Sequence, residues 1–493
     1  MLEAAALQRV GHLQERAVEG LAEAARRQAG RDPGVGPGEV RTEIQRALKD
    51  IHKNSASIRQ LRHLVDAQTP GYLDNWHDKW SSAGDPPELE FTSRSLAGHL
   101  LDLGLSPEHL YRWLQAIAGA GKAPSVPELI DEARTLAART PHLYEVLIPV
   151  STMPKKRQAM PSNWLEREAA AKWIRDQGVG DGSGVEQNGG FTIEVTARDP
   201  WRAVEIASDI AQGLASRTVV GLPGEGEMRV HEVAIVRGTS RVFPLARPRR
   251  QVEVHAISRQ GVLYDSSDPR LMGRLRTAID LLVPLEVGAP ESAVSGGWAA
   301  VEAVLKRQDA PNVQAAHDLG ALVACSFPRA ELTSLSCAYA ASHPGDALTT
   351  ALEECTSNRE RCNLLQTAIG THSHADFTEP SDAAAAGRIE DVLGRPSEVL
   401  SRVRDYATET FGRLYRQRNL VLHAGKGDSV AMLSTLRCAP PLIGAAFDRI
   451  VHAALQDPSV EAEDLVARAE VSLRLAGTNS RRNLADLLEA SDR

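Results

Sequence analysis

Hydrophobic residues recur with a helical period through the first part of the chain. Apolar side chains return at intervals of three and four over residues 7–13 and again over residues 44–64. A stretch rich in glycine and proline, residues 31–38, separates the first two helices. Residues 125–128 (Ser-Val-Pro-Glu) have the serine–glutamate spacing of a capping box, which marks a helix start. The pattern predicts a helical N-terminal domain over residues 1–140.

From residue 141 the hydrophobic period changes from three or four to two. Short segments rich in β-branched and aromatic residues alternate with helical segments, which is typical of a small α/β layer. We predict such a domain over residues 141–290. The predicted strands are residues 143–150, 191–196, 228–236 and 251–257, and the predicted helices are residues 163–176 and one beginning at Asp199.

Beyond residue 290 the helical period returns and continues to the end of the chain. We expect Pro440-Pro441 to bend or split one of the helices, because proline lacks a backbone N–H. The chain is therefore predicted to be mainly α, with a helical bundle over residues 291–493 as its third domain. The predicted helices of this bundle are residues 294–307, 312–325, 327–341, 346–368, 396–423, 428–455, 460–475 and 479–490.

The composition is that of an ordinary folded protein, and it limits the classes of partner. The chain has 493 residues, of which 42% are hydrophobic and 24% charged, with a formal net charge of −8. Bulk electrostatic binding to nucleic acid is excluded by this charge, so any RNA contact would need a local basic patch. The N-terminal residues carry no secretory pattern, and no run of about 18 apolar residues occurs. We expect a cytoplasmic protein with no membrane partner.

Cysteine usage indicates a reducing compartment. The five cysteines form no Cys-x-x-Cys pair, and their number is odd, so we expect buried, reduced thiols. An alternative is a zinc site formed by Cys355, Cys362, His372 and His374, although the gap between the two cysteines is wider than zinc sites usually have.

Two glycine-rich segments do not fit nucleotide-binding loops. Gly119-Ala-Gly-Lys122 lacks both the earlier glycine and the following serine or threonine of a P-loop. Residues 178–190 have neither a lysine–serine ending nor the glycine order of a dinucleotide fingerprint. We predict no cofactor and no metal.

The strongest chemical signal lies near the end of the helix predicted at 396–423. Arg418, Asn419 and His423 stand close together on an otherwise apolar segment. Asn419 and His423 are one turn apart and share a helix face, and Gly425 suits a left-handed cap that would end the helix. A neutral imidazole can accept the proton of a ribose 2′-hydroxyl while a guanidinium stabilises the charged phosphate. The residue set is therefore typical of RNA cleavage.

This stretch resembles the HEPN domain of prokaryotic defence and toxin ribonucleases. The resemblance lies in an arginine followed by a polar residue and, after a short apolar gap, a histidine, as in Arg418, Asn419 and His423. On an earlier helix, Trp298 and Glu302 match the apolar and polar positions that support the site in this family. The resemblance covers about the last 200 residues.

The resemblance implies a metal-independent endoribonuclease in anti-phage defence that arrests growth. His423 would be the base, Arg418 would stabilise the phosphate, and Asn419 would orient one of them. Two motifs would meet across a homodimer or higher oligomer, and the RNA product would end in a 2′,3′-cyclic phosphate. Residues 1–290 would respond to a phage-derived trigger or a partner defence protein. One alternative is a non-catalytic HEPN-like module for pairing or nucleotide recognition. Another is that Arg418 and His423 only cap the helix end and form surface salt bridges.

Basic residues outside the motif are candidates for RNA or partner binding. Arg247, Arg249 and Arg250 surround Pro248, and guanidinium groups bind phosphates and carboxylates well. A solvated corner between a loop and a strand is the alternative for this cluster. Arg416 and Lys426, on either side of the motif, are two further candidates because of their charge and position.

Overall fold

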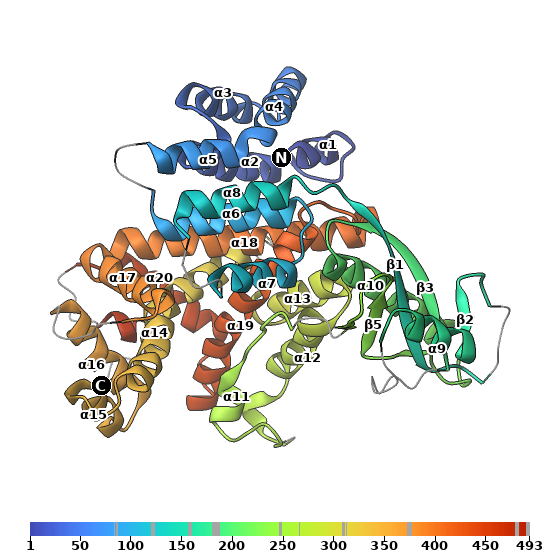
Figure 1. Cartoon of the computed structure of the whole chain (residues 1–493). Coiled ribbons are helices and arrows are strands. Elements are labelled where there is room, and N and C mark those ends of the chain that lie inside the picture. Colours follow the sequence, from blue (N-terminus) through green and yellow to red (C-terminus); the bar gives the residue numbers. More distant parts are fainter. Residues whose placement is uncertain are drawn as a thin grey trace. The chain divides into compact units, whose positions relative to one another are not determined.

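The computed structural model describes most of the chain, and the described part is mainly helical with a small α/β region, as predicted (Figure 1). The strands of its sheet are paired antiparallel, which the sequence did not indicate. Two compact units divide it, Met1–Pro248 and Arg249–Arg493. Within the described part, no helix combines the length and apolar character needed to cross a membrane. The described residues are 1–82, 84, 87–119, 124–155, 160–179, 188–245, 249–265, 267–307, 311, 313–371, 377–478 and 483–489.

The first unit begins with two groups of helices, each with its own apolar core. One group holds α1–α4 and the other α5–α8, and short 3-10 turns at Pro33–Val35 and Thr69–Gly71 lie between helices. The helices are α1 (Leu2–Arg9), α2 (Glu15–Arg31), α3 (Gly38–Lys49), α4 (Ser55–Gln68), α5 (Tyr72–Ser81), α6 (Leu89–Asp102), α7 (Pro107–Ala118) and α8 (Val126–Ala137).

Local capping explains where these helices begin and end. The capping box of Ser125 and Glu128 is formed at the start of α8, as predicted. The helical pattern predicted over residues 7–13 is wrong beyond Arg9, because Gly11 adopts a φ of +78° and turns the chain. The pattern over residues 44–64 is divided into α3 and α4, since Asn54 accepts a hydrogen bond from the Ala56 amide and starts a new helix.

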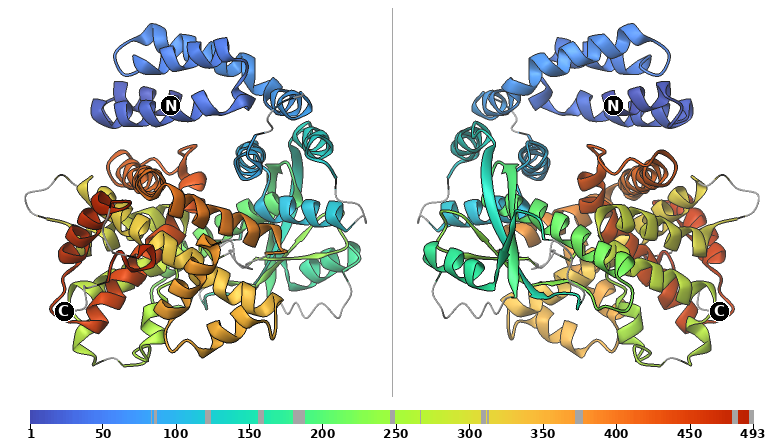
Figure 2. Two further views of the ribbon diagram at one scale, coloured as in Figure 1. Left: turned by 90° about the vertical axis from the view of Figure 1, so that its left-hand side faces the viewer. Right: turned by 90° about the vertical axis from the view of Figure 1, so that its right-hand side faces the viewer.

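An antiparallel sheet follows in the same unit, in the order β2-β3-β1-β5-β6, with β4 also paired to β1. Alternate residues of β1 face opposite layers: Val146 and Ile148 share a core with α10, and Leu147 shares one with α9. Figure 2 shows the same elements from two further sides. The elements are β1 (His142–Thr152), β2 (Trp164–Glu166), α9 (Arg167–Asp176), β3 (Gly189–Ala197), α10 (Pro200–Gly221), β4 (Arg229–Val230), β5 (Val233–Val236) and β6 (Val242–Pro244).

Three predictions for this region need correction. The helix predicted at 163–176 begins as strand β2, because its first residues pair with β3. The strand predicted at 228–236 is two short strands, β4 and β5. No strand forms at 251–257, where the Val252 amide instead donates to the Glu286 carboxylate and the chain continues into α11 (His255–Arg259).

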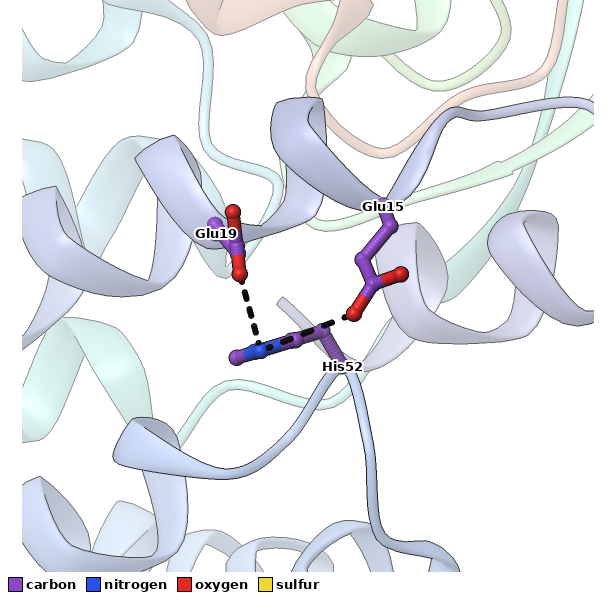
Figure 3. Close-up of side chains that lie close together, drawn as sticks. All are labelled: Glu15, Glu19 and His52. Carbon is purple, nitrogen blue, oxygen red and sulfur yellow. Dashed lines mark ion pairs between the residues drawn. The ribbon is translucent and has the colours of Figure 1, made fainter.

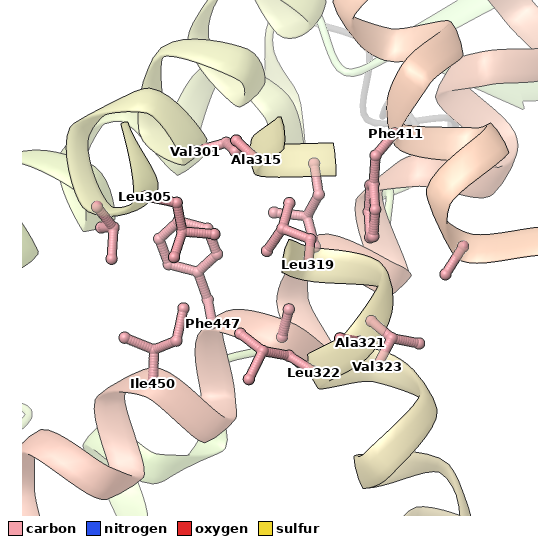
Figure 4. Close-up of a cluster of buried hydrophobic side chains, with 14 of the residues drawn as sticks. Val301, Leu305, Ala315, Leu319, Ala321, Leu322, Val323, Phe411, Phe447 and Ile450 are labelled. Carbon is pink, nitrogen blue, oxygen red and sulfur yellow. The ribbon is translucent and has the colours of Figure 1, made fainter. Parts of the chain in front are cut away.

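The second unit is a helical bundle whose largest core includes residues from 256 to 488. Figure 4 shows part of this core, with Leu319 drawn between Phe447 and Phe411. α14 and α18 approach closely at Gly320, where a Cβ would lie 2.2 Å from the Thr408 hydroxyl. The helices after α11 are α12 (Arg274–Val287), α13 (Pro290–Leu305), α14 (Gln314–Ser342), α15 (Ala347–Glu354), α16 (Asn358–Gly370), α17 (Pro380–Gly394), α18 (Pro396–Ala424), α19 (Met432–Gln456) and α20 (Ala462–Leu475), with 3-10 turns at Pro269–Leu271 and Leu484–Asp486.

Prolines break this bundle less than predicted. The two helices predicted at 312–325 and 327–341 are one helix, α14, with Pro328 buried inside it. Helix α19 likewise continues through Pro440-Pro441. Burial of these helices against their neighbours offsets the few backbone hydrogen bonds that proline removes.

Elsewhere in the bundle, local caps and turns decide the boundaries. The helix predicted at 346–368 is divided into α15 and α16, because Ser357 accepts a hydrogen bond from the Glu360 amide and caps α16. Helix α17 was not predicted. The end of the last predicted helix lies outside the described residues, and its described part contains a 3-10 turn at Leu484–Asp486.

All five cysteines are free thiols, but the expectation that they are buried is only partly correct. Cys325 and Cys362 are buried, Cys355 is half-buried, and Cys337 and Cys438 are exposed. The histidines of the alternative zinc set, His372 and His374, lie outside the described residues.

Candidate active site on helix α18

The C-terminal end of α18 presents the predicted motif. Leu414, Gln417 and Leu420 are buried and spaced by three, so they form the inward stripe of this helix. Gly425 ends the helix in the left-handed conformation with φ of 60°, as predicted, and its amide donates to the Leu420 carbonyl. His423 therefore lies in the last turn, with an exposed side chain.

The guanidinium of Arg418 is the centre of the site. Its Nη1 donates to Oδ1 of Asn419 at 3.0 Å and lies 3.4 Å from Nε2 of His423. Its Nη2 lies 3.6 Å from Oε2 of Glu302 on α13. The side chains of Arg418 and Glu302 are only 21% and 18% exposed, so their attraction is screened less than that of a surface pair. One arginine thus joins residues from two helices.

Trp298 supports this arrangement from the buried side of α13. It is completely buried on α13, and its ring centroid lies 4.9 Å from that of Tyr415 on α18. Trp298 and Glu302 are one turn apart, so the indole fills the space between the helices while the carboxylate reaches the edge. The tryptophan ring therefore helps to set the distance at which Glu302 meets Arg418. This is the pairing of apolar and polar positions that the sequence analysis singled out.

The contact with Arg418 indicates the tautomer of a neutral His423. A guanidinium has only donors, so the contact with Arg418 is a hydrogen bond only when Nε2 of His423 carries its lone pair. The ring proton is then on Nδ1. In this state Arg418 occupies the Nε2 lone pair, so the imidazole can accept a proton from a hydroxyl once the guanidinium turns from Nε2 to a bound phosphate.

Comparison of the chain with models of known protein families, with curated proteins and with solved structures finds no match in any of the three. The geometry around Arg418 therefore carries the functional argument.

The other basic residues are not part of this cluster. Arg416 is two positions before Arg418, which places it roughly 200° around the helix. Burial, followed by the nearby charge of Arg413, lowers the pKa of Arg416 to about 10. Lys426 is exposed just beyond the helix end, where its amide donates to the Leu420 carbonyl. Of these two residues, Lys426 is the better placed to meet a ligand from solvent.

The three arginines of the cluster before α11 differ in their surroundings. Arg247 lies outside the described residues, and Arg249 is exposed. Arg250 donates through its guanidinium to the carbonyls of Leu285 and Gly288, both at 2.8 Å, and so caps the end of α12. Its side chain is thereby engaged within the second unit.

Sequence reasoning missed two features that matter for sites. Tyr415 was not recognised as the partner of Trp298, although its position three residues before Arg418 on a helix could have indicated a neighbour. A cluster of Glu15, Glu19 and His52 in the first unit was missed because its histidine comes from another part of the chain. Only the glutamates carry a local signal, their spacing of four on one helix.

Proposed function

We propose that the second unit is a metal-independent endoribonuclease whose active site contains Arg418, Asn419 and His423. The observation that carries the proposal is the position of the Arg418 guanidinium, which is held by Glu302 and lies beside the exposed imidazole of His423. A base next to a fixed cation at the surface is what 2′-hydroxyl attack on a phosphodiester requires.

In the proposed reaction, Nε2 of His423 accepts the proton of a ribose 2′-hydroxyl. The 2′-oxygen attacks the adjacent phosphorus, the bond to the 5′-oxygen breaks, and a 2′,3′-cyclic phosphate forms. Arg418 stabilises the negative charge on the phosphate oxygens, and Asn419 orients the guanidinium through its 3.0 Å contact. The substrate supplies its own nucleophile, so the mechanism requires no metal-activated water.

The leaving 5′-oxygen needs a proton from a second group. The described cluster contains one histidine, which is occupied as the base. A second copy of the chain would supply another His423 as the acid, so we propose a homodimer or higher oligomer in which two motifs meet. An isologous interface is favoured because it brings the same patch together twice.

The biological role is proposed from the resemblance to HEPN ribonucleases. The RNA substrate would be cut in the cytoplasm during phage infection, with growth arrest as the result. The first unit would act as the sensor or restraint, responding to a phage-derived trigger or a partner defence protein. Arg249, the exposed first residue of the second unit, directly follows the first unit in sequence and is a further candidate for such a contact.

The test compares RNA cleavage by the wild-type protein with that by His423→Ala. His255→Ala is the matched control, because His255 is also an exposed histidine of the second unit. We expect the His423 variant to lose cleavage by a factor of about 10² or more. We expect the control and chelator-treated wild type to remain active. Mass spectrometry should find 2′,3′-cyclic phosphate ends. RNA binding without cleavage by the wild type would favour the non-catalytic module instead.

A further inference from the structure

A histidine and two glutamates converge in the first unit, on the surface of the α1–α4 group (Figure 3). Glu15 and Glu19 lie one turn apart on α2, and His52 comes from the turn between α3 and α4. Nε2 of His52 lies 3.1 Å from Oε1 of Glu19 and 3.9 Å from Oε1 of Glu15. One potential ligand atom from each residue lies within 4.8 Å of the others.

The histidine is the unusual member of this cluster. Its side chain is only 6% exposed, whereas those of Glu15 and Glu19 are 58% and 46% exposed. Neither ring nitrogen of His52 has a hydrogen-bond partner with acceptable geometry. A buried polar group without a partner is costly, and buried polar side chains are nearly always satisfied. In Figure 3 the imidazole is seen nearly edge-on, and the line to Glu19 leaves the plane of the ring, which is why the 3.1 Å contact is not a hydrogen bond. A rotation of the ring would be needed to turn the Nε2 lone pair toward a ligand held by the two carboxylates.

The spacing of the three groups fits a transition-metal ion. Two ligands at about 2.0–2.1 Å from a tetrahedral zinc lie roughly 3.3 Å apart. The two histidine–glutamate distances, 3.1 and 3.9 Å, lie on either side of that value. Both glutamate side chains are about half exposed, so a change of rotamer that brings them around an ion meets few neighbours. An imidazole together with carboxylates favours zinc over magnesium or calcium, which prefer oxygen ligands alone.

We propose that Glu15, Glu19 and His52 bind one divalent transition-metal ion, with Zn²⁺ as the expected ion. His52 would bind through Nε2 and each glutamate through one carboxylate oxygen, with water completing the coordination. The site borders a surface pocket of about 460 Å³ whose wall also contains Arg16 and Lys49, so solvent reaches it from the outside.

A simple ion pair explains the cluster less well. An ion pair between His52 and the carboxylates would leave the 3.1 Å contact without hydrogen-bond geometry. The buried ring nitrogens would still lack good hydrogen bonds. Arg16 and Lys49 line the neighbouring pocket, but the ligand atoms of Glu15, Glu19 and His52 lie within 4.8 Å of one another. A metal ion satisfies Nε2 and neutralises two like charges held one turn apart.

The proposed ion would link separate segments of the first helical group. Glu15 stands at the first position of α2, and His52 follows α3, beside the buried residues Leu48 and Ile51. The metal would therefore fix the start of α2 to the turn between α3 and α4, and its binding free energy would add to the stability of this group. The inference is independent of the proposed ribonuclease activity.

The experiment uses the full-length, untagged protein after removal of metal with a chelator. Titration calorimetry with ZnCl₂ should find one tight site, and MgCl₂ should not compete for it. Because loss of an outer-shell group already weakens metal sites by about 10–100-fold, Glu19→Gln and His52→Gln should weaken zinc binding by more than roughly 100-fold. Glu23→Gln, on the next turn of α2, is the matched control and should bind zinc as the wild type does.

Circular dichroism shows whether each variant folds. If His52→Gln does not fold, zinc binding by the exposed-site variants Glu15→Gln and Glu19→Gln tests the proposal. X-ray absorption of the zinc complex should show nitrogen and oxygen ligands only. The inference is overturned if the wild type binds no zinc, if Glu19→Gln binds it unchanged, if Glu23→Gln loses it equally, or if sulfur ligands appear.

Discussion

Nη1 of Arg418 lies 3.4 Å from Nε2 of His423, on the same helix and in its last two turns. The contact keeps the proposed base and the proposed phosphate-binding cation adjacent before any RNA is present. Glu302 holds the other side of the guanidinium from a different helix. Such support by a neighbouring element is what keeps a site in its productive geometry.

The planar shape of Arg418 should matter as much as its charge. Lysine keeps the positive charge but cannot meet Glu302, Asn419 and a phosphate with a fixed set of donors. We expect Arg418→Lys to reduce the rate of RNA cleavage by about tenfold or more, as when one stabilising donor is weakened. Arg395→Lys, at an exposed ion pair beside the opposite, N-terminal end of the same helix, serves as the control and should keep full activity. Equal rates in the two variants would remove Arg418 from the mechanism.

The features that the sequence predicted correctly depend on residues close together in the chain. The end of α18 at Gly425 and the start of α8 at Ser125 rest on nearby residues, and both predictions are confirmed. Strand β2 forms because it pairs with β3, which follows only after helix α9. A pattern read from residues 163–176 alone does not contain this pairing. His52 meets Glu19 for a similar reason, since tertiary packing alone brings the two segments together.

Exposed apolar side chains beside the motif indicate where two copies would meet. Leu422 is 53% exposed and Val430 is 83% exposed, at the end of α18 and in the loop that follows. If the motifs pair across a twofold axis, these side chains become buried. Leu422→Asp should therefore shift the protein toward monomer in light scattering and lower cleavage with it. The control is Val471→Asp on α20, an exposed valine away from the motif, which should leave the oligomer intact. A fully active monomeric variant would contradict composite catalysis.

The stability of the second unit should depend on pH through Glu489. Burial alone would raise the pKa of this carboxyl, but the charges of Arg329 and Arg449 lower it to about 2, from 4.5. Since the folded-state pKa lies below the unfolded value, the stabilisation is complete above about pH 4.5 and is lost as the pH falls toward 2. Glu489 donates no proton to its partners at neutral pH; it accepts from Arg449 at 2.8 Å.

We expect Glu489→Gln to lower the free energy of unfolding of this unit by about 2–3 kcal/mol at pH 7, and by about 1 kcal/mol near pH 3. Denaturant unfolding at the two pH values measures the difference. The matched control is Glu398→Gln, which removes an exposed ion pair with Arg395 and should change stability by less than about 0.5 kcal/mol. A loss that is the same at both pH values would show that Glu489 acts by packing and not by charge.

The second unit should fold only when residues 249–290 are included. Leu282 and Leu285 of α12 are buried in the core of this unit, and α12 packs closely on α13 at Gly296 and Gly297. Each leucine contributes about 1.5–3 kcal/mol when it is buried. A fragment beginning at residue 291 would expose the α12 side of α13, so we expect it to aggregate. A fragment of residues 249–493 should be soluble and unfold cooperatively in calorimetry.

The same fragment tests whether the first unit restrains the enzyme. If it does, residues 249–493 should arrest cell growth at expression levels where the full chain does not, because the restraint has been removed. His423→Ala in the fragment should abolish this toxicity, whereas His255→Ala should keep it. A fragment that is folded and dimeric but harmless would show that residues 1–248 help to build the active enzyme. In that case the metal site proposed at Glu15, Glu19 and His52 would support activity by stabilising a required domain, and its removal from the full chain should lower RNA cleavage.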